Sequence, residues 1–122
     1  MPLAVIQHKA GGELRELAGQ LAKKLPHIIA PALSVETHER HDGKLTSEDI
    51  EVWCFEGTSD DVNTKDLEII IWAHEYPERL KNFEERKDMI VSNVRRILNE
   101  YGYQDVKGFV WILLQPSAFG RF

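Results

Sequence analysis

The sequence predicts an α+β fold in which two consecutive βαβ units form a four-stranded sheet with two helices on one face. Its apolar pattern follows the order strand, helix, strand, strand, helix, strand. The two halves also resemble each other. Residues 5–8 and 71–74 each precede a loop and an amphipathic helix, and residues 51–53 and 109–111 follow those helices. Matched positions of element, loop and element indicate an internal repeat.

The first predicted strand begins almost at the start of the chain. Residues 2–8 are mostly apolar and partly β-branched, and Gly11 and Gly12 end the strand. Apolar residues then recur at spacings of three and four, which is typical of a helix with one buried stripe. They are Leu14, Leu17, Leu21 and Leu25, and Pro26 is expected to end the regular part of this helix.

The segment that follows this helix is harder to assign. Residues 27–33 are too apolar for a solvated loop, but Pro31 interrupts them, so the pattern decides neither for a loop nor for a helix. Residues 35–47 are polar and are expected to form an exposed loop or a loose hairpin. Residues 48–56 alternate between two faces and predict the second strand.

The second half repeats this arrangement. Residues 67–74 are the most apolar run and predict a central strand, and Pro77 marks the loop after it. A long helix is expected over about 80–100, with Gly102 as its C-cap. Residues 108–114 predict the last strand.

Length and composition bound the class of protein. At 122 residues we expect one domain over 1–122, with repeat units at about 2–56 and 67–114 and a tail at 115–122. The net charge of −5 and the lack of a basic patch argue against nucleic-acid binding. No apolar run is long enough for a membrane span. The single cysteine, Cys54, agrees with a cytoplasmic location.

Pro2 is the leading candidate for catalysis. Met1 is generally removed before a small residue, which would leave Pro2 with a free secondary amine. An ordinary α-amino group has a pKa of about 7.7–8, and an apolar pocket or nearby cations lower it, so that the neutral base is abundant at pH 7. The ring holds this nitrogen rigidly at the end of a strand, which suits removal of a proton next to a carbonyl.

Pro2 at the start of a strand, followed by two βαβ units, resembles the tautomerase superfamily. That superfamily includes oxalocrotonate tautomerase, carboxymethyl-hydroxymuconate isomerase, macrophage migration inhibitory factor and haloacrylate-processing enzymes. Residues 2–6 look like its opening strand, and 45–47 resemble the turn before its second strand. The same arrangement of strands is repeated in the second half, where the strands begin at Leu67 and Gly108. The resemblance implies a cofactor-free isomerase in which Pro2 is the general base. It would transfer a proton between the keto and enol forms of a small carbonyl or carboxylate compound. The resemblance also implies a homotrimer.

The sequence departs from the family at two cationic positions. Gly12 and Glu51 stand where the family often carries arginines that bind substrate carboxylates, and Arg15 comes three residues late. Arg79, in the matching strand-to-helix loop of the second unit, and Arg121, in the tail, are the candidate substrate-binding replacements. A solvated loop charge and a frayed terminus are the simpler interpretations of these two arginines.

Two other functions stay open. A non-catalytic protein of the tautomerase fold would keep Pro2 but serve binding or assembly. A ferredoxin-like binding module has the same order of elements, but it would pair its strands in an antiparallel, split arrangement.

Several reactive side chains have simpler interpretations. His38 and His41 suggest a metal site, but without a third spaced ligand a polar loop is the better interpretation, and no metal is expected. Cys54 is typical of a small core residue. His8 and His74 end equivalent strands, where a hydrogen-bonded histidine is the common case.

Overall fold

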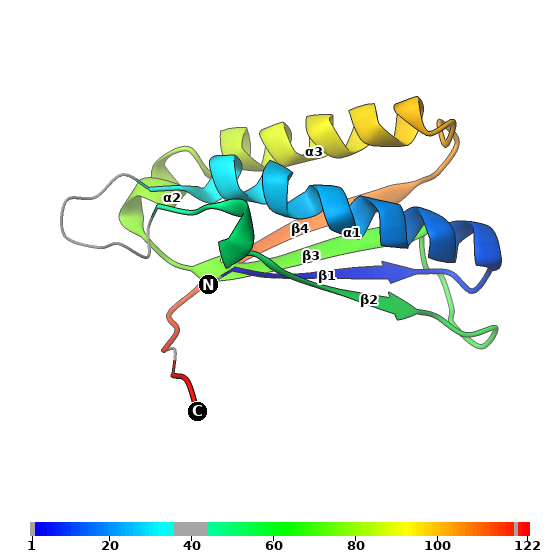
Figure 1. Ribbon diagram of the computed structural model, residues 1–122, viewed down its shortest axis with the longest axis horizontal. Coiled ribbons are helices and arrows are strands. Elements are labelled where there is room, and N and C mark those ends of the chain that lie inside the picture. The colour runs from blue at the N-terminus through cyan, green and yellow to red at the C-terminus, as the bar shows by residue number, and fades with distance from the viewer. Residues whose placement is uncertain (1, 36–43, 119) are drawn as a thin grey trace.

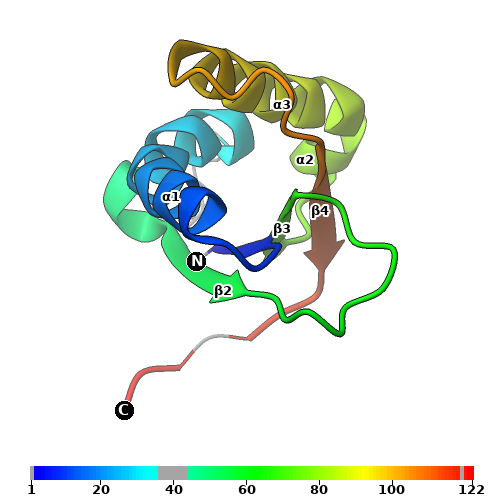
Figure 2. The same ribbon diagram turned by 90° about the vertical axis from the view of Figure 1, so that its right-hand side faces the viewer.

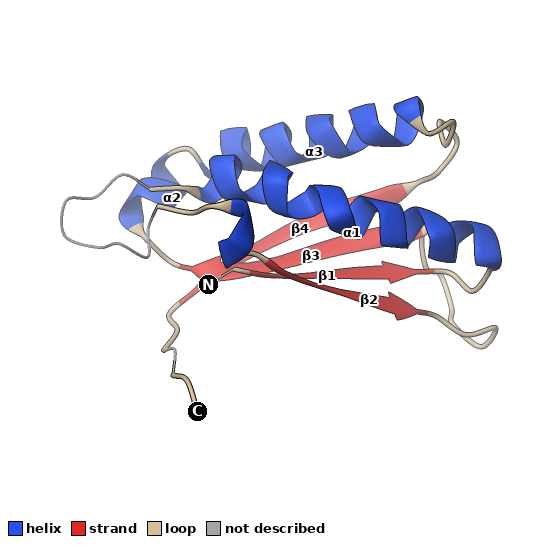
Figure 3. Ribbon diagram, viewed as in Figure 1, coloured by secondary structure: helices blue, strands red, loops and turns tan. Residues whose placement is uncertain are grey.

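A computed structural model of the protein describes residues 2–35, 44–118 and 120–122. The strands are β1 (Leu3–His8), β2 (Glu51–Glu56), β3 (Leu67–His74) and β4 (Gly108–Gln115). The helices are α1 (Gly12–Leu33), α2 (Pro77–Lys81) and α3 (Phe83–Glu100), with a short 3₁₀ helix, η2 (Ser47–Asp49), before β2. Figure 3 shows the helices and the strands in two separate layers.

The four strands form one mixed sheet in the order β2-β1-β3-β4. β1 pairs with β2 in parallel and β3 pairs with β4 in parallel, so each half is a βαβ unit. The two units meet through the antiparallel pair of β1 and β3 at the centre of the sheet. Parallel pairing within each unit confirms the predicted α+β architecture and excludes the split antiparallel arrangement of a ferredoxin-like module.

Both long helices cover the same face of the sheet (Figures 1 and 2). Alternate residues of the inner strands point into the layer between sheet and helices, because successive side chains of a strand face opposite sides. The fully buried residues Ala4, Ile6, Ile69 and Ile71 form the floor of this core. Among the described helices, none is long and apolar enough to cross a membrane.

Helix α1 continues well beyond the predicted end at Pro26. It runs through Pro26 and Pro31 to Leu33, so the unassigned residues 27–33 are helical. Each proline removes one hydrogen bond to the carbonyl four residues earlier. Pro31 is exposed and Pro26 is half-buried, so neither proline belongs to the fully buried stripe of the helix. The stripe itself continues through Ile28, Ile29 and Leu33, and its burial holds the helix together.

The second helical region is divided where one long helix was predicted. Asn82, with φ −130° and ψ 42°, separates α2 from α3, and its side-chain oxygen accepts a hydrogen bond from Arg86 Nε at 2.6 Å. The predicted end of the helix is close to the observed one. Gly102 follows the cap residue Tyr101. The φ of Gly102 is +84°, a left-handed conformation that glycine adopts without strain.

The other face of the sheet is covered by no helix and carries large apolar side chains. Trp53 and Phe55 of β2 are 54% and 50% exposed, and Trp111 and Phe109 of β4 are 52% and 45% exposed. The registers place Trp53, Val5, Ile70 and Trp111 side by side in one row across the four strands. This open face is therefore flanked on both edge strands by half-exposed aromatic rings.

Candidate functional site

Pro2 directly precedes β1, one of the two inner strands of the sheet. It is buried, and its carbonyl oxygen accepts a hydrogen bond from Glu51 N at 3.2 Å. Extending the two registers by one residue places Ile50 on one side of Pro2 and Ala73 on the other. Both neighbours are buried and apolar. The fold therefore places the predicted base in a buried position with apolar neighbours at one end of the sheet.

Arg79 lies near this end of the sheet, but in helix α2 and not in a loop as predicted. It is 1% exposed. Its Nε donates to Leu33 O at 2.8 Å, and its NH1 donates to His74 O at 2.7 Å. The guanidinium also lies over the Tyr76 ring, 4.8 Å from the centroid. Arg79 thus joins the C-terminal end of α1 to the end of β3, and its role in substrate binding stays a prediction.

The tail that follows β4 begins beside the same sheet end. Glu75 N donates to Gln115 O at 3.0 Å, and His74 Nδ1 lies 2.9 Å from Ser117 Oγ. Arg121 is in the exposed end of this tail, and its role in substrate binding also stays a prediction. Figure 1 shows the tail leaving the sheet near the N-terminus.

No family model and no curated protein matches the sequence. Solved structures do match. The crystal structure of Pt0534, a tautomerase-superfamily protein, inactivated by 2-oxo-3-pentynoate has 14% identity and a TM-score of 0.58, covering 93% of this chain and 86% of that chain. A probable enzyme from the thermophilic fungus Aspergillus fumigatus has 14% identity and a TM-score of 0.52, covering 100% of this chain and 80% of that one. A homologue of macrophage migration inhibitory factor from Prochlorococcus marinus has 10% identity and a TM-score of 0.45, covering 93% and 89%.

The protein has the tautomerase-superfamily fold. Within that fold, the two positions at which the family often has arginines are occupied differently here. Gly12 is the first residue of α1, and a side chain added there would meet open space. Glu51 is the first residue of β2, and its Oε1 accepts a hydrogen bond from Trp53 Nε1 at 3.0 Å. A carboxylate therefore lies one strand away from Pro2, where the family pattern has a cation.

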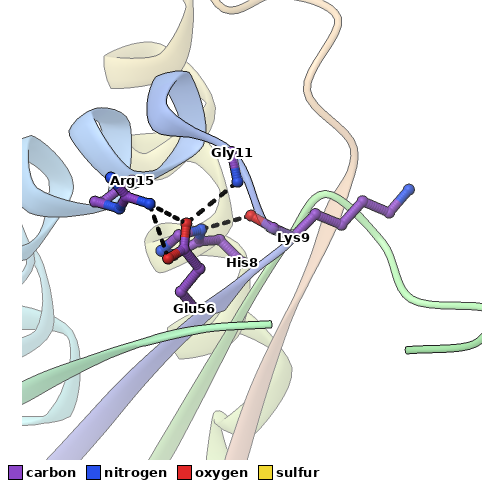
Figure 4. Close-up of polar contacts among 5 residues, drawn as sticks. All are labelled: His8, Lys9, Gly11, Arg15 and Glu56. Carbon is purple, nitrogen blue, oxygen red and sulfur yellow. Dashed lines mark hydrogen bonds and ion pairs between the residues drawn. The ribbon is translucent and has the colours of Figure 1, made fainter. Parts of the chain in front are cut away.

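Arg15, which is three residues after Gly12, lies at the opposite end of the sheet from Pro2. It contacts Glu56 there (Figure 4). Its NH2 lies 2.9 and 3.0 Å from the two carboxylate oxygens of Glu56, at the end of β2. Gly11 N also donates to Glu56 Oε1, at 3.2 Å. The Arg15 hydrogen bond and then the Gly11 hydrogen bond hold the pKa of Glu56 below its ordinary value. This pair fastens the start of α1 to β2.

Two cavities in the described part of the structure lie away from Pro2. One, of about 270 Å³, is at the far end of β1 and is lined by His8, Glu56 and Glu68 among others. The other, of about 260 Å³, lies between α3 and β4 and has mainly apolar walls. Neither cavity is lined by Pro2 or by its strand neighbours Ile50 and Ala73. We place the candidate site at Pro2 on its geometry and chemistry, not on cavity size.

The remaining sequence candidates do not form a second site among the described residues. His38 and His41 lie outside the described residues, and the described part of the chain contains no group of three or more metal-binding side chains. Cys54 is exposed on edge strand β2 and not in the core as expected; its Sγ lies 3.8 Å from Ala18 O. Partial burial raises the pKa of the Cys54 thiol, which disfavours the reactive thiolate.

Proposed function

We propose that this protein is a tautomerase or isomerase in which the Pro2 nitrogen is the general base. The substrate is a small carbonyl or carboxylate compound. The observation that carries this proposal is the position of Pro2, which is buried at the start of an inner strand in a tautomerase-superfamily fold. Once Met1 is removed, the apolar neighbours Ile50 and Ala73 disfavour the charged form of the Pro2 amine.

One structural neighbour also supports this chemistry. Pt0534 is inactivated by 2-oxo-3-pentynoate, a compound with a carbonyl group next to a triple bond. A 2-oxo compound therefore reaches a reactive group in a protein with this fold. We propose that this chain likewise accepts an enolisable carbonyl compound at Pro2.

The test combines mass spectrometry with a ketonisation assay. Mass spectrometry of the purified protein is expected to show a chain that begins at Pro2. The wild type is then expected to ketonise phenylenolpyruvate or a hydroxymuconate, and Pro2→Ala is expected to lose at least about 100-fold in kcat/KM, since general-base catalysis contributes about 10²–10⁴-fold. Pro26→Ala, in α1, is the matched control and keeps full activity. A retained Met1, or undiminished activity of Pro2→Ala, contradicts the proposal.

We also propose that the protein acts as a homotrimer. Proteins of this fold are typically small oligomers. The open face has half-exposed Trp53 and Trp111 at its two edges, and an apolar patch of this kind marks an interaction surface. The unpaired sides of β2 and β4 are two further surfaces that a second copy protects. The tail that follows β4 is expected to contribute to the interface.

Sedimentation equilibrium measures this assembly directly. The wild type is expected to sediment with three times the chain mass, and Trp53→Lys with the mass of one chain, because the lysine would be buried in the interface. Val91→Lys is the control, since Val91 is 41% exposed on α3, in the helical layer on the other side of the sheet. A monomeric wild type contradicts the trimer.

A non-catalytic protein of the same fold is the second candidate. Gly12 and Glu51 favour it, because neither residue carries the positive charge that attracts a substrate carboxylate. The Pro2→Ala assay separates the two candidates. With either function, the single cysteine suits a reducing compartment, and we propose that the protein is cytoplasmic.

A further inference from the structure

His74 lies at the end of the sheet where Pro2 begins. β1 and β3 are antiparallel, and the last register pair at this end joins Leu3 to Trp72. Counting outward, Ala73 is beside Pro2, and His74 is one residue beyond it. Adjacent strands lie about 4.8 Å apart, so His74 borders the space in front of the Pro2 nitrogen once the chain begins at Pro2. A substrate that delivers a proton to that nitrogen occupies the same space.

The imidazole of His74 is held from two sides. Its Nδ1 lies 2.9 Å from Ser117 Oγ, in the tail after β4. Its ring meets the Tyr76 ring edge-on, with 4.7 Å between centroids and 65° between planes. Tyr76 is only 3% exposed, and Arg79 lies against its ring. Because each neighbour restricts a rotation of the side chain, the imidazole is pre-organised before any ligand binds.

The backbone of His74 is fixed as well. Arg79 NH1 donates to His74 O at 2.7 Å, and the same guanidinium donates from Nε to Leu33 O. The last residue of β3 is therefore fastened to the last residue of α1. This connection fixes where the imidazole lies relative to the sheet end.

The hydrogen bond at Nδ1 leaves the Nε2 of His74 for another partner. His74 is partly exposed, so a small molecule can reach its ring. A neutral imidazole has one N–H donor and one acceptor nitrogen. When the Ser117 hydroxyl donates to Nδ1, the proton of the ring is on Nε2. In that tautomer His74 offers a neutral N–H donor at the end of the sheet where Pro2 lies.

We propose that His74 is a second catalytic residue, which stabilises the enolate oxygen through Nε2–H, and that Ser117 is the positioning residue that sets its tautomer. This inference rests on the proposed function of Pro2. The Pro2 nitrogen takes a proton from the carbon next to the carbonyl, and the electron pair of that C–H bond forms the carbon–carbon double bond. The π electrons of the carbonyl move to its oxygen, which accepts the hydrogen bond from Nε2–H. The protonated Pro2 then returns the proton to another atom of the same molecule.

This assignment explains how the site works without the family arginines. A pre-organised donor aimed at a developing oxyanion contributes through electrostatic stabilisation, and the loss of one such donor costs on the order of 10²–10³-fold in kcat. One neutral donor serves a single enolate oxygen. The substrate class that fits is an enolisable ketone, aldehyde or 2-oxo acid whose reacting oxygen lies beside His74.

The first experiment compares histidine variants in the ketonisation assay. His74→Ala is expected to lose about 100-fold in kcat with little change in KM, because the interaction is made in the transition state. Added imidazole is expected to restore part of this loss. Ser117→Ala is expected to lose about 10-fold, because the wrong tautomer becomes accessible. His27→Gln, exposed on α1, is the matched control with unchanged kcat.

The second experiment requires no turnover. Long-range ¹H–¹⁵N NMR spectra of the wild type report the His74 tautomer, and the proposal requires the proton on Nε2. Observation of the Nδ1–H tautomer overturns it whatever the assay shows. Thermal unfolding of each variant shows whether a loss of activity reflects a loss of fold.

The outcomes also separate this inference from the proposed function. If Pro2→Ala is inactive while folded His74→Ala keeps the wild-type kcat, the role of His74 is refuted and that of Pro2 stands. If Pro2→Ala keeps full activity, Pro2 is not the base and both proposals fail. If both variants lose kcat and imidazole restores His74→Ala, both proposals are supported.

Discussion

Removal of the Arg79 side chain is expected to be among the most damaging single changes in this chain. Arg79 is 1% exposed and donates to Leu33 O at 2.8 Å and to His74 O at 2.7 Å. Each hydrogen bond from a charged group contributes about 1.5–3 kcal/mol, and the stacking on Tyr76 adds about 0.5–2 kcal/mol. Arg79→Ala should therefore lower the free energy of unfolding by about 3.5–8 kcal/mol. Since domains are stable by about 5–15 kcal/mol, this is a large share of the total.

Urea unfolding monitored by circular dichroism measures this loss. Arg79→Lys is expected to recover less than half of it, because an ammonium group cannot reproduce the planar fork that reaches two carbonyls. Arg96→Ala is the matched control. Arg96 lies on the exposed face of α3 in an ion pair with Glu100 at 3.0 Å, and its loss should cost about 0.3–0.5 kcal/mol. If Arg79→Ala unfolds within about 1 kcal/mol of the wild type, the reasoning from burial and hydrogen bonding is refuted.

Two further predictions concern pH and backbone packing. The Arg15 and Gly11 hydrogen bonds lower the pKa of Glu56 below its ordinary value of 4.5. The stability that these hydrogen bonds add is therefore fully present above pH 4.5. It is lost as the pH falls through the lower pKa that Glu56 has in the folded state. Glu56→Gln should therefore be less stable than the wild type at pH 7 and equally stable at acid pH; equal stability at both pH values contradicts this. A Cβ at Gly108 would collide with Leu67 O at the start of the β3–β4 pair. Gly108→Ala should lose about 1–3 kcal/mol, while Gly12→Ala, with open space around it, should not; equal unfolding midpoints for both variants count against the packing argument.

Local patterns in the sequence predicted most of the secondary structure. Alternating apolar residues located the four strands, and a period near 3.6 located α1 and the region of α2 and α3. The end of α1 was predicted wrongly because proline propensity was given more weight than burial. The stripe at Ile28, Ile29 and Leu33 packs in the core, and this tertiary gain outweighs the two hydrogen bonds lost at Pro26 and Pro31.

The candidate site was predicted only in part. The sequence singles out Pro2 because it directly precedes the first strand and would carry a free amine once Met1 is removed, and its role as the base stays a prediction. His74 was set aside as an ordinary strand-end histidine, because nothing near it in the sequence points to Pro2. The available signal was the repeat itself, since antiparallel pairing of the two central strands brings the end of one to the start of the other. Arg79 was identified as a loop cation, and its burial follows from the short helix α2 and from the C-terminal carbonyls of α1.

The sequence by itself determined the order of elements, the two βαβ units and the position of the first strand to within one residue. Those properties depend on periodicities within a dozen residues. The tertiary structure alone decided that β1 lies between β2 and β3, and that His74 and Ser117 meet at the end of the sheet where β1 begins. It also decided that Arg79 is enclosed against the end of α1. The physical reason is that strand adjacency and burial arise from contacts between residues far apart in the chain, which no local pattern records.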